Sequence, residues 1–145
     1  FCAPPAVKAC NEKISAGIGI GINWARSVLE TRDVETPVAH IREAAEAGVL
    51  KGLMFSGCTG ESNAYGPWRD CHMPHAPTPE AAFAADGSLM TESKIAEALA
   101  AVRETNTDLL YCGCKITALQ DPTGSDVPIR VGLNSDLISI IGKRV

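Results

Sequence analysis

The sequence predicts a single α/β domain in which parallel strands alternate with helices. In residues 17–23, glycine and isoleucine alternate with the two-residue period of a strand. Helices and strands are then expected in turn along all 145 residues, an order that favours parallel strands joined by right-handed crossovers. Finally, each predicted strand has an apolar face and a second face that ends in a polar residue, namely Asn23, Ser56 or Lys115.

Composition and charge exclude several classes of protein. The chain is 46% hydrophobic and 21% charged, with a net charge of −4 and scattered basic residues, so neither nucleic acid nor an anionic membrane is an expected partner. No apolar run approaches the ~20 residues of a membrane span, and no secretory signal is recognisable. The six cysteines match no zinc-binding spacing, so we expect reduced thiols and a cytoplasmic location.

The first quarter of the chain is expected to hold a helix and then a strand. Residues 1–16 are a loop followed by a short helix whose first turn holds Pro4 and Pro5 and whose apolar residues share one side. Strand 17–23 follows, and its three glycines on one face indicate close approach of another group to that face. Residues 24–35 are expected to be irregular or briefly helical.

A phosphate-binding glycine loop that opens a helix at Asn23 is the alternative interpretation of residues 17–23. Such a fingerprint needs an apolar strand before its first glycine. Residues 11–16 are mostly polar, and the strand is therefore the favoured prediction.

The second quarter repeats the pattern. Thr36 and Pro37 predict a helix start, with threonine as the N-cap and proline in the first turn. Gly48 is a natural stop for this helix. Strand 50–56 follows, with apolar side chains on one face and Ser56 ending the other.

The rest of the chain begins with a long loop. Residues 57–90 are rich in Gly, Pro, Asn and Ser, and loops of this length in a compact domain are uncommon and often functional. Thr91 is the predicted cap of the next helix, and a third strand is expected over residues 109–117. A turn at residues 121–124 and a last helix from about Asp126 complete the pattern.

The polar strand ends favour one α/β architecture, because such positions ring the mouth of the active site in a (β/α)8 barrel. Four segments follow one another as in the C-terminal half of the xylose-isomerase-like barrel superfamily: NWARS at 23–27, TPVAHI at 36–41, GLMFSG at 52–57 and YGPWRDCH at 65–72. The chain resembles, in particular, a poorly characterised bacterial branch of that superfamily. The resemblance implies about three and a half βα units of a TIM barrel, forming one half-barrel domain over residues 1–145. A small open parallel sheet is the alternative.

The resemblance also implies a class of activity. The superfamily is known for sugar isomerases, sugar epimerases and a metal-dependent DNA-repair nuclease, and its usual metal ligands at strand ends are carboxylates and histidine. The expected function is therefore isomerisation or epimerisation of a carbohydrate or polyol by proton transfer; a non-catalytic sugar-binding or assembly subunit is the alternative. Asn23, Ser56 and Lys115 are poor metal ligands, so the usual ligands are absent from these strand ends. A divalent metal is possible, but the sequence does not identify a cofactor.

Catalytic candidates lie on the third strand and the long loop. Lys115, if it faces apolar walls inside the barrel, can act as a base or form a Schiff base; a structural ion pair is the alternative. Asp70, His72 and His75 form the pattern D-x-H-x-x-H. They can hold a metal or act as acid and base on a sugar hydroxyl, unless they are ordinary polar loop residues.

Six further residues are predicted to contact the substrate: Asn23, Trp24, Arg26, Ser56, Glu61 and Trp68. Arg26 can clamp a carboxylate or phosphate, or pair with Glu30 one helical turn away. The two tryptophans can stack on a sugar ring or simply pack the loops. Glu61 is a spare carboxylate for acid–base chemistry, or a solvent-exposed one.

Three strands cannot close a barrel, which needs about eight. The two edges of an open sheet also remain unpaired and invite further pairing. We therefore expect these residues to pack against a half-barrel that precedes Phe1 in the same chain or comes from another chain, and to form a homo-oligomer.

Overall fold

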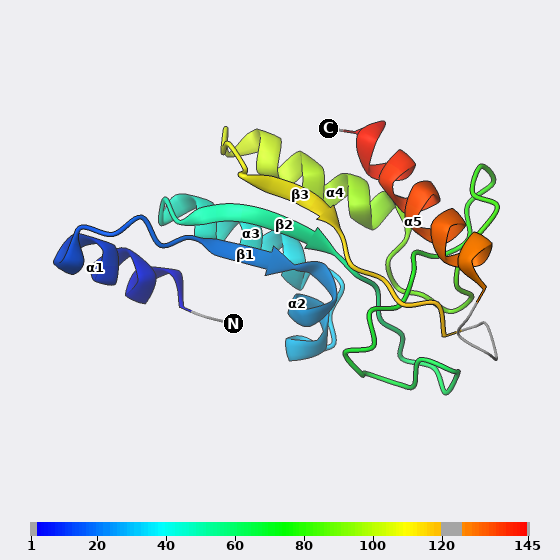
Figure 1. Ribbon diagram of the computed structural model, residues 1–145. Coiled ribbons are helices and arrows are strands. Elements are labelled where there is room, and N and C mark those ends of the chain that lie inside the picture. The colour runs from blue at the N-terminus through cyan, green and yellow to red at the C-terminus, as the bar shows by residue number, and fades with distance from the viewer. Residues whose placement is uncertain (1–2, 120–125, 145) are drawn as a thin grey trace.

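The structure is a computed structural model that describes residues 3–119 and 126–144 (Figure 1). Its elements in chain order are α1 (Pro4–Ile14), β1 (Ile20–Asn23), α2 (Trp24–Thr31), α3 (Thr36–Glu46), β2 (Leu50–Phe55), α4 (Glu92–Glu104), β3 (Tyr111–Cys114) and α5 (Val127–Gly142). The strands form one open parallel sheet in the order β1-β2-β3. The α/β class and the parallel alternation are confirmed, and the open sheet matches the alternative architecture. No helix among the described residues is long and apolar enough to cross a membrane.

The helices that follow β1 pack on one face of the sheet (Figure 1). Side chains from the sheet and from these helices form one buried cluster, which includes Ile22, Leu53, Phe55, Ile41, Ile95 and Leu99. Full burial of one such side chain contributes about 1.5–3 kcal/mol, so this layer is the main source of stability. The predicted apolar faces of β1 and β2 therefore meet the helices as expected.

The opposite face of the sheet is occupied by the side chain of Tyr111. Gly21 pairs with Gly52, and Gly52 pairs with Tyr111 across the three strands. A Cβ at Gly21 would collide with the tyrosine hydroxyl, and one at Gly52 would collide with the ring. The predicted close approach to the glycine face is thus confirmed. Tyr111 is nevertheless 46% exposed, because helices α2–α5 leave this face uncovered.

A valine at Gly52 is expected to destabilise the chain by about 1–3 kcal/mol, as overpacking does. The new side chain would displace the ring of Tyr111. Gly113→Val is the matched control, because a Cβ at Gly113 has no neighbour within 4 Å. Urea unfolding should show a larger loss for Gly52→Val, and the Tyr111→Ala background should diminish the difference. Equal losses at both glycines would contradict the packing argument.

The first strand is shorter than predicted. It begins at Ile20 instead of residue 17, because the backbone N–H and C=O of Ile18 bond to the side chain of Asn11 at 2.9 and 2.8 Å. The pairing with β2 also shifts register between Ile20 and Gly21. Hydrogen bonds to the side chain of Asn11 thus take the place of sheet pairing at Ile18, between the first two glycines of the segment.

The third strand, Tyr111–Cys114, is also shorter than the predicted 109–117. Beyond Cys114 the backbone soon forms hydrogen bonds with the long loop instead of β2. The N–H of Lys115 still donates to the carbonyl of Phe55 at 2.9 Å, whereas the N–H of Thr117 donates to the carbonyl of His72 at 2.8 Å. The end of β3 is therefore tied to the long loop.

The predicted helix starts are mostly confirmed. Thr91 caps α4 and Asp126 caps α5, each through a side chain that accepts from the backbone N–H three residues on. The exception is α3, where Glu35 is the N-cap and Thr36 is already helical. The predicted turn at residues 121–124 lies outside the described residues.

The first helix is not part of the core layer. α1 lies beyond the amino end of β1 (Figure 1), and Ile14 at its end is exposed. Val7 is only half-buried against the core cluster. The predicted apolar side of this helix is therefore largely open to solvent.

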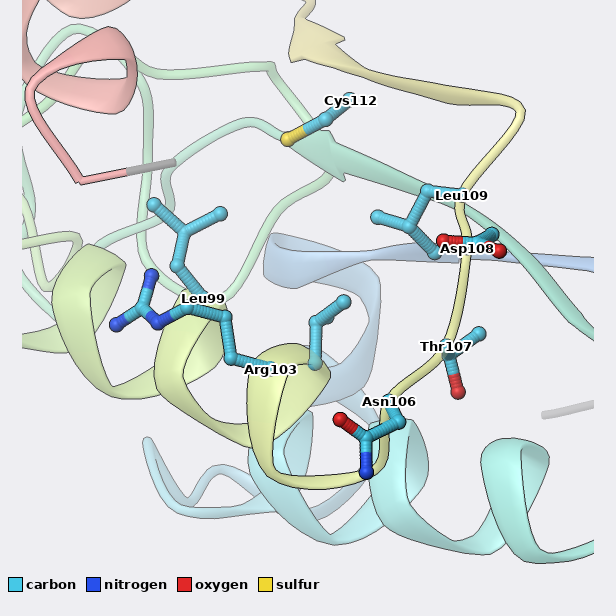
Figure 2. Close-up of a pocket in the computed structure, with 8 residues that line it drawn as sticks. Leu99, Arg103, Asn106, Thr107, Asp108, Leu109 and Cys112 are labelled. Atoms are coloured by element: carbon cyan, nitrogen blue, oxygen red, sulfur yellow. The ribbon is translucent and has the colours of Figure 1, made fainter.

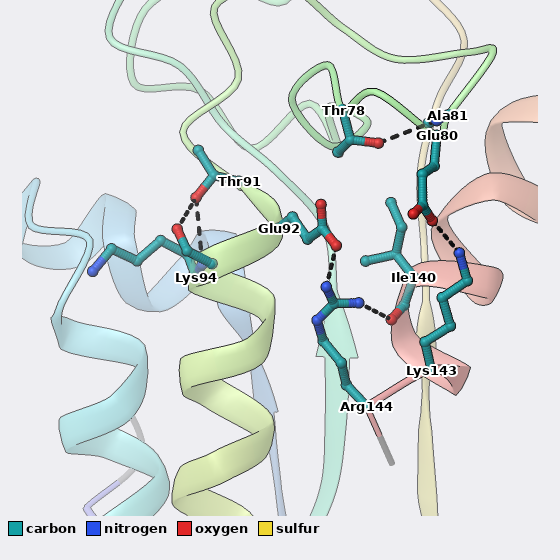
Figure 3. A network of polar contacts seen from close by, with 10 residues as sticks. Thr78, Glu80, Ala81, Thr91, Glu92, Lys94, Ile140, Lys143 and Arg144 are labelled. Carbon is teal, nitrogen blue, oxygen red and sulfur yellow. Dashed lines mark hydrogen bonds and ion pairs between the residues drawn. The ribbon is translucent and has the colours of Figure 1, made fainter.

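The carboxyl end of α5 is tied by ion pairs to the long loop, residues 57–90, and to the start of α4. Lys143 pairs with Glu80 of the loop, and Arg144 pairs with Glu92 at the start of α4 (Figure 3). As predicted, this loop contains no helix or sheet strand. Its one isolated bridge joins Gly57 to Met73.

Candidate functional site

The carboxyl ends of β1 and β2 bring two predicted site residues together. Asn23 ends β1, and Ser56 follows β2 directly. The hydroxyl of Ser56, which is fully buried, donates to Asn23 Oδ1 at 2.9 Å. The same oxygen accepts from the N–H of Arg26 at 3.2 Å and so caps α2. The common parity of these two strand ends is confirmed, but the amide oxygen of Asn23 is already used within the protein.

Arg26, Asp70 and His72 form a cluster beside these strand ends. Arg26 Nε lies 2.9 Å from Asp70 Oδ2, and Asp70 Oδ1 lies 3.2 Å from His72 Nδ1. The second contact lacks hydrogen-bond geometry, so it is an ion pair when the imidazole is protonated. Arg26 therefore pairs with Asp70 of the long loop, a partner that the sequence did not predict for it.

The backbone of the long loop positions this cluster. Gly57 and Met73 exchange two backbone hydrogen bonds of 2.7 and 3.0 Å, which return the loop to the end of β2. A Cβ at Gly57 would lie 2.8 Å from the carbonyl oxygens of Met73 and Pro74, so only glycine fits. Trp68 and His72 both have φ of +53°. Such left-handed conformations of non-glycine residues are strained, and they cluster at functional sites.

The ring of His72 is oriented for proton transfer. Its Nδ1 is buried and lies 3.2 Å from Asp70 Oδ1, while the side chain as a whole is 18% exposed. A proton accepted at Nε2 would make an imidazolium that faces the Asp70 carboxylate. This arrangement suits a general base.

Lys115 follows β3 on the uncovered side of the sheet and is exposed. The predicted apolar walls around it are not supplied by the described residues. Its backbone is nevertheless close to the cluster, because Thr117, two residues on, bonds to His72. The structure thus brings the lysine segment to the loop, with the ammonium group in solvent.

Residues 5–133 match a family described as a domain of unknown function, DUF4862. The chain belongs to the DUF4862 family. An uncharacterised protein of Salmonella typhimurium is 35% identical to this DUF4862 domain over 140 residues, which are 96% of this chain and 41% of the relative. The chain thus spans less than half the length of the curated relative that it matches. No solved structure matches the chain.

Three predicted substrate contacts are placed differently in this DUF4862 domain. Trp24 is 1% exposed inside the core cluster, so it cannot stack on a sugar. Trp68 is half-buried against the core, with the guanidinium of Arg32 5.6 Å above its ring. Glu61 is exposed and its carboxylate lies beside Gly87. Packing in the core accounts for Trp24, whereas Trp68 and Glu61 keep surface that solvent reaches.

His75 does not join Asp70 and His72, which corrects the predicted D-x-H-x-x-H site. Its side chain is 0% exposed, and its two ring nitrogens have no hydrogen-bond partner among the described residues. Burial lowers its pKa, while Asp136 and Glu92 act in the opposite direction. Within residues 3–119 and 126–144, no group of three or more ligating side chains is arranged to hold a metal.

Acidification is expected to destabilise the chain through His75. Because the pKa of His75 is lower in the folded chain than its ordinary value of 6.5, the unfolded chain binds the proton first as the pH falls. The contribution to stability is complete above pH 6.5, and below it the free energy of unfolding falls by up to about 1.4 kcal/mol per pH unit.

Urea unfolding between pH 7.5 and 5 checks this prediction. A His75→Phe variant, which cannot titrate at this position, should lose part of the pH dependence. His40→Phe is a parallel variant and not a silent one, because burial also lowers the pKa of the half-buried His40 while Glu30 and Glu43 oppose it, so this variant should lose its own part of the pH dependence. An unchanged pH dependence in the His75 variant would rule out this role.

The cysteines of the described residues are free thiols, as predicted. Burial, and next the charge of Asp70, raises the pKa of Cys58 to about 12. Burial also raises the pKa of Cys112 and Cys114. A thiol whose pKa is raised in this way is a poor nucleophile, so cysteine chemistry at this site is disfavoured.

One cavity lies away from the cluster. It measures about 630 Å³ and is formed by the end of α4 and the loop before β3, with Leu99, Val102, Leu109 and Cys112 as its apolar lining (Figure 2). Arg103, Asn106 and Asp108 also line it. Because it borders the amino end of β3, opposite the strand ends that carry chemistry in α/β enzymes, we do not assign the reaction to it.

Proposed function

We propose that this chain supplies catalytic groups of a sugar isomerase or epimerase. The observation that supports the proposal is the Arg26–Asp70–His72 cluster at the carboxyl ends of parallel strands. Isomerisation of an α-hydroxy carbonyl sugar requires a base that removes a proton from the carbon beside the carbonyl. His72, with its buried Nδ1 beside a carboxylate and a side chain that solvent partly reaches, has an arrangement that suits this role.

In the proposed step, His72 Nε2 takes the proton from that carbon. The electron pair of the C–H bond forms a carbon–carbon double bond, and the carbonyl electrons move to oxygen to give an enediolate. The ammonium group of Lys115 and the guanidinium of Arg26 stabilise the negative oxygen. Return of the proton to the neighbouring carbon, with a proton shift between the oxygens, completes an aldose–ketose isomerisation, whereas epimerisation needs return from the other face.

We also propose that the sheet is part of a (β/α)8 barrel. Parallel sheets are normally covered on both faces, and here the face that carries Gly21, Gly52 and Tyr111 is uncovered by α2–α5. Further strands from the same or another chain would cover it, and the greater length of the Salmonella relative leaves room for them. Solution mass and melting of residues 1–145 test this: a cooperative, monomeric species would overturn it, whereas self-association or a broad melt would support it.

The activity is tested by solvent exchange. The protein is incubated with aldoses and ketoses in D2O, and proton NMR follows loss of the signal of the hydrogen beside the carbonyl. Exchange that is lost in His72→Gln but kept in His40→Gln is the expected result. Sugars that raise the melting temperature without exchange would favour the non-catalytic sugar-binding alternative, and an absence of both effects would overturn the proposal.

A further inference from the structure

Tyr65 links the long loop to the segment that follows β3. It is almost fully buried, and its ring packs with Met73 and Ala85 in a small apolar cluster. Its hydroxyl donates to the carbonyl of Thr117 at 2.9 Å and accepts from the N–H of Leu119 at 3.1 Å. One side chain thus holds the backbone of a segment that lies more than fifty residues away in sequence.

Thr117 is held from both sides by this loop. Its carbonyl accepts from Tyr65, and its N–H donates to the carbonyl of His72 at 2.8 Å. His72 itself adopts a left-handed backbone conformation, which directs its carbonyl toward this bond. Lys115 is two residues before Thr117, so the position of its backbone relative to His72 depends on these contacts.

We propose that Tyr65 is a positioning residue, whose hydroxyl sets the separation between Lys115 and His72. The catalytic part of this inference, an effect on sugar turnover, rests on the proposed function. The physical reason is that a buried hydroxyl used both as donor and as acceptor fixes two backbone groups at once, and leaving either unpaired is unfavourable. The ring already packs in its own cluster, so the hydroxyl, and not the ring, carries the positioning role.

The test is a Tyr65→Phe variant followed by amide hydrogen exchange. The Leu119 amide must lose protection, because it donates to the missing hydroxyl. The informative amide is that of Thr117, which donates to the carbonyl of His72, and we expect its exchange to accelerate at least tenfold. We also expect kcat for the sugar to fall while KM is unchanged. Tyr111→Phe is the control, because it removes a tyrosine hydroxyl from the other end of the sheet.

Acceleration confined to Leu119, with Thr117 still protected and kcat unchanged, would overturn the inference. If wild-type protein turns over no sugar, the proposed function fails, while the Thr117 amide still reports whether the hydroxyl positions the segment. If Tyr65→Phe does not fold, Leu119→Pro removes the N–H that donates to the hydroxyl. Because the hydroxyl is proposed to fix both backbone groups together, this variant should also accelerate exchange at Thr117, and a Thr117 amide as protected as in the wild type would contradict this role of Tyr65.

Discussion

A His72→Gln variant is expected to exchange the hydrogen of a bound sugar with solvent about 10²–10⁴-fold more slowly than the wild type, which is the usual contribution of a general base. Glutamine retains hydrogen-bonding capacity but cannot accept the proton. The buried Nδ1 and the neighbouring Asp70 carboxylate are the features from which we propose His72 as the base. NMR-detected exchange at fixed sugar concentration measures the effect.

Asp70→Asn provides the second arm of this test. The amide keeps the shape of the side chain but removes the charge that faces the imidazolium and Arg26. We expect a smaller loss of exchange rate than for His72→Gln. An unaffected rate in the His72 variant would transfer the base role to Lys115, and the cluster would then be a structural ion pair.

A Trp24→Ala variant is expected to lose about 3–5 kcal/mol of folding free energy, the usual range for truncating a fully buried tryptophan. Trp24 is 1% exposed and packs with Ala25 and Val28 in the main core cluster. Urea unfolding measures the loss directly. Because its ring is inaccessible to a ligand, sugar affinity per folded molecule should remain unchanged.

Trp68→Ala is the matched control for Trp24. This ring is only half-buried, and Arg32 lies over it, so the expected loss of stability is smaller. A loss at Trp24 below 1 kcal/mol, accompanied by weakened sugar binding, would contradict the core assignment.

Local patterns predicted the strands and helices well, because their causes are local. The alternation of glycine and isoleucine before Asn23 reflects burial of one strand face, and the cap at Thr91 depends on a side chain three residues from its partner. The convergence of Asn23 and Ser56 followed from strand parity. In each case the determining contact lies within an element or between paired strands.

The contacts of the long loop could not be predicted from the sequence, because they depend on where it returns to the sheet. The Gly57–Met73 bridge turns Asp70 toward Arg26, whereas the residues just beyond it bury His75. Loop composition contains no periodic signal for either outcome. Tyr65 lies in residues 65–72, one of the segments that resemble the xylose-isomerase-like superfamily. Its proposed role, however, depends on the backbone groups of Thr117 and Leu119, which are distant in sequence.

Strand order in the sheet follows chain order, β1-β2-β3, and this has a consequence for biosynthesis. Each strand leaving the ribosome finds its neighbour already present, so the helical side of the layer can assemble progressively from short-range crossovers. The other face is not completed in this way: Tyr111, which is 46% exposed there, stays in contact with water unless the covering strands of the proposed barrel pack against it. We expect a folding chaperone to bind this open face during synthesis, and the proposed covering strands to compete with the chaperone for the same surface.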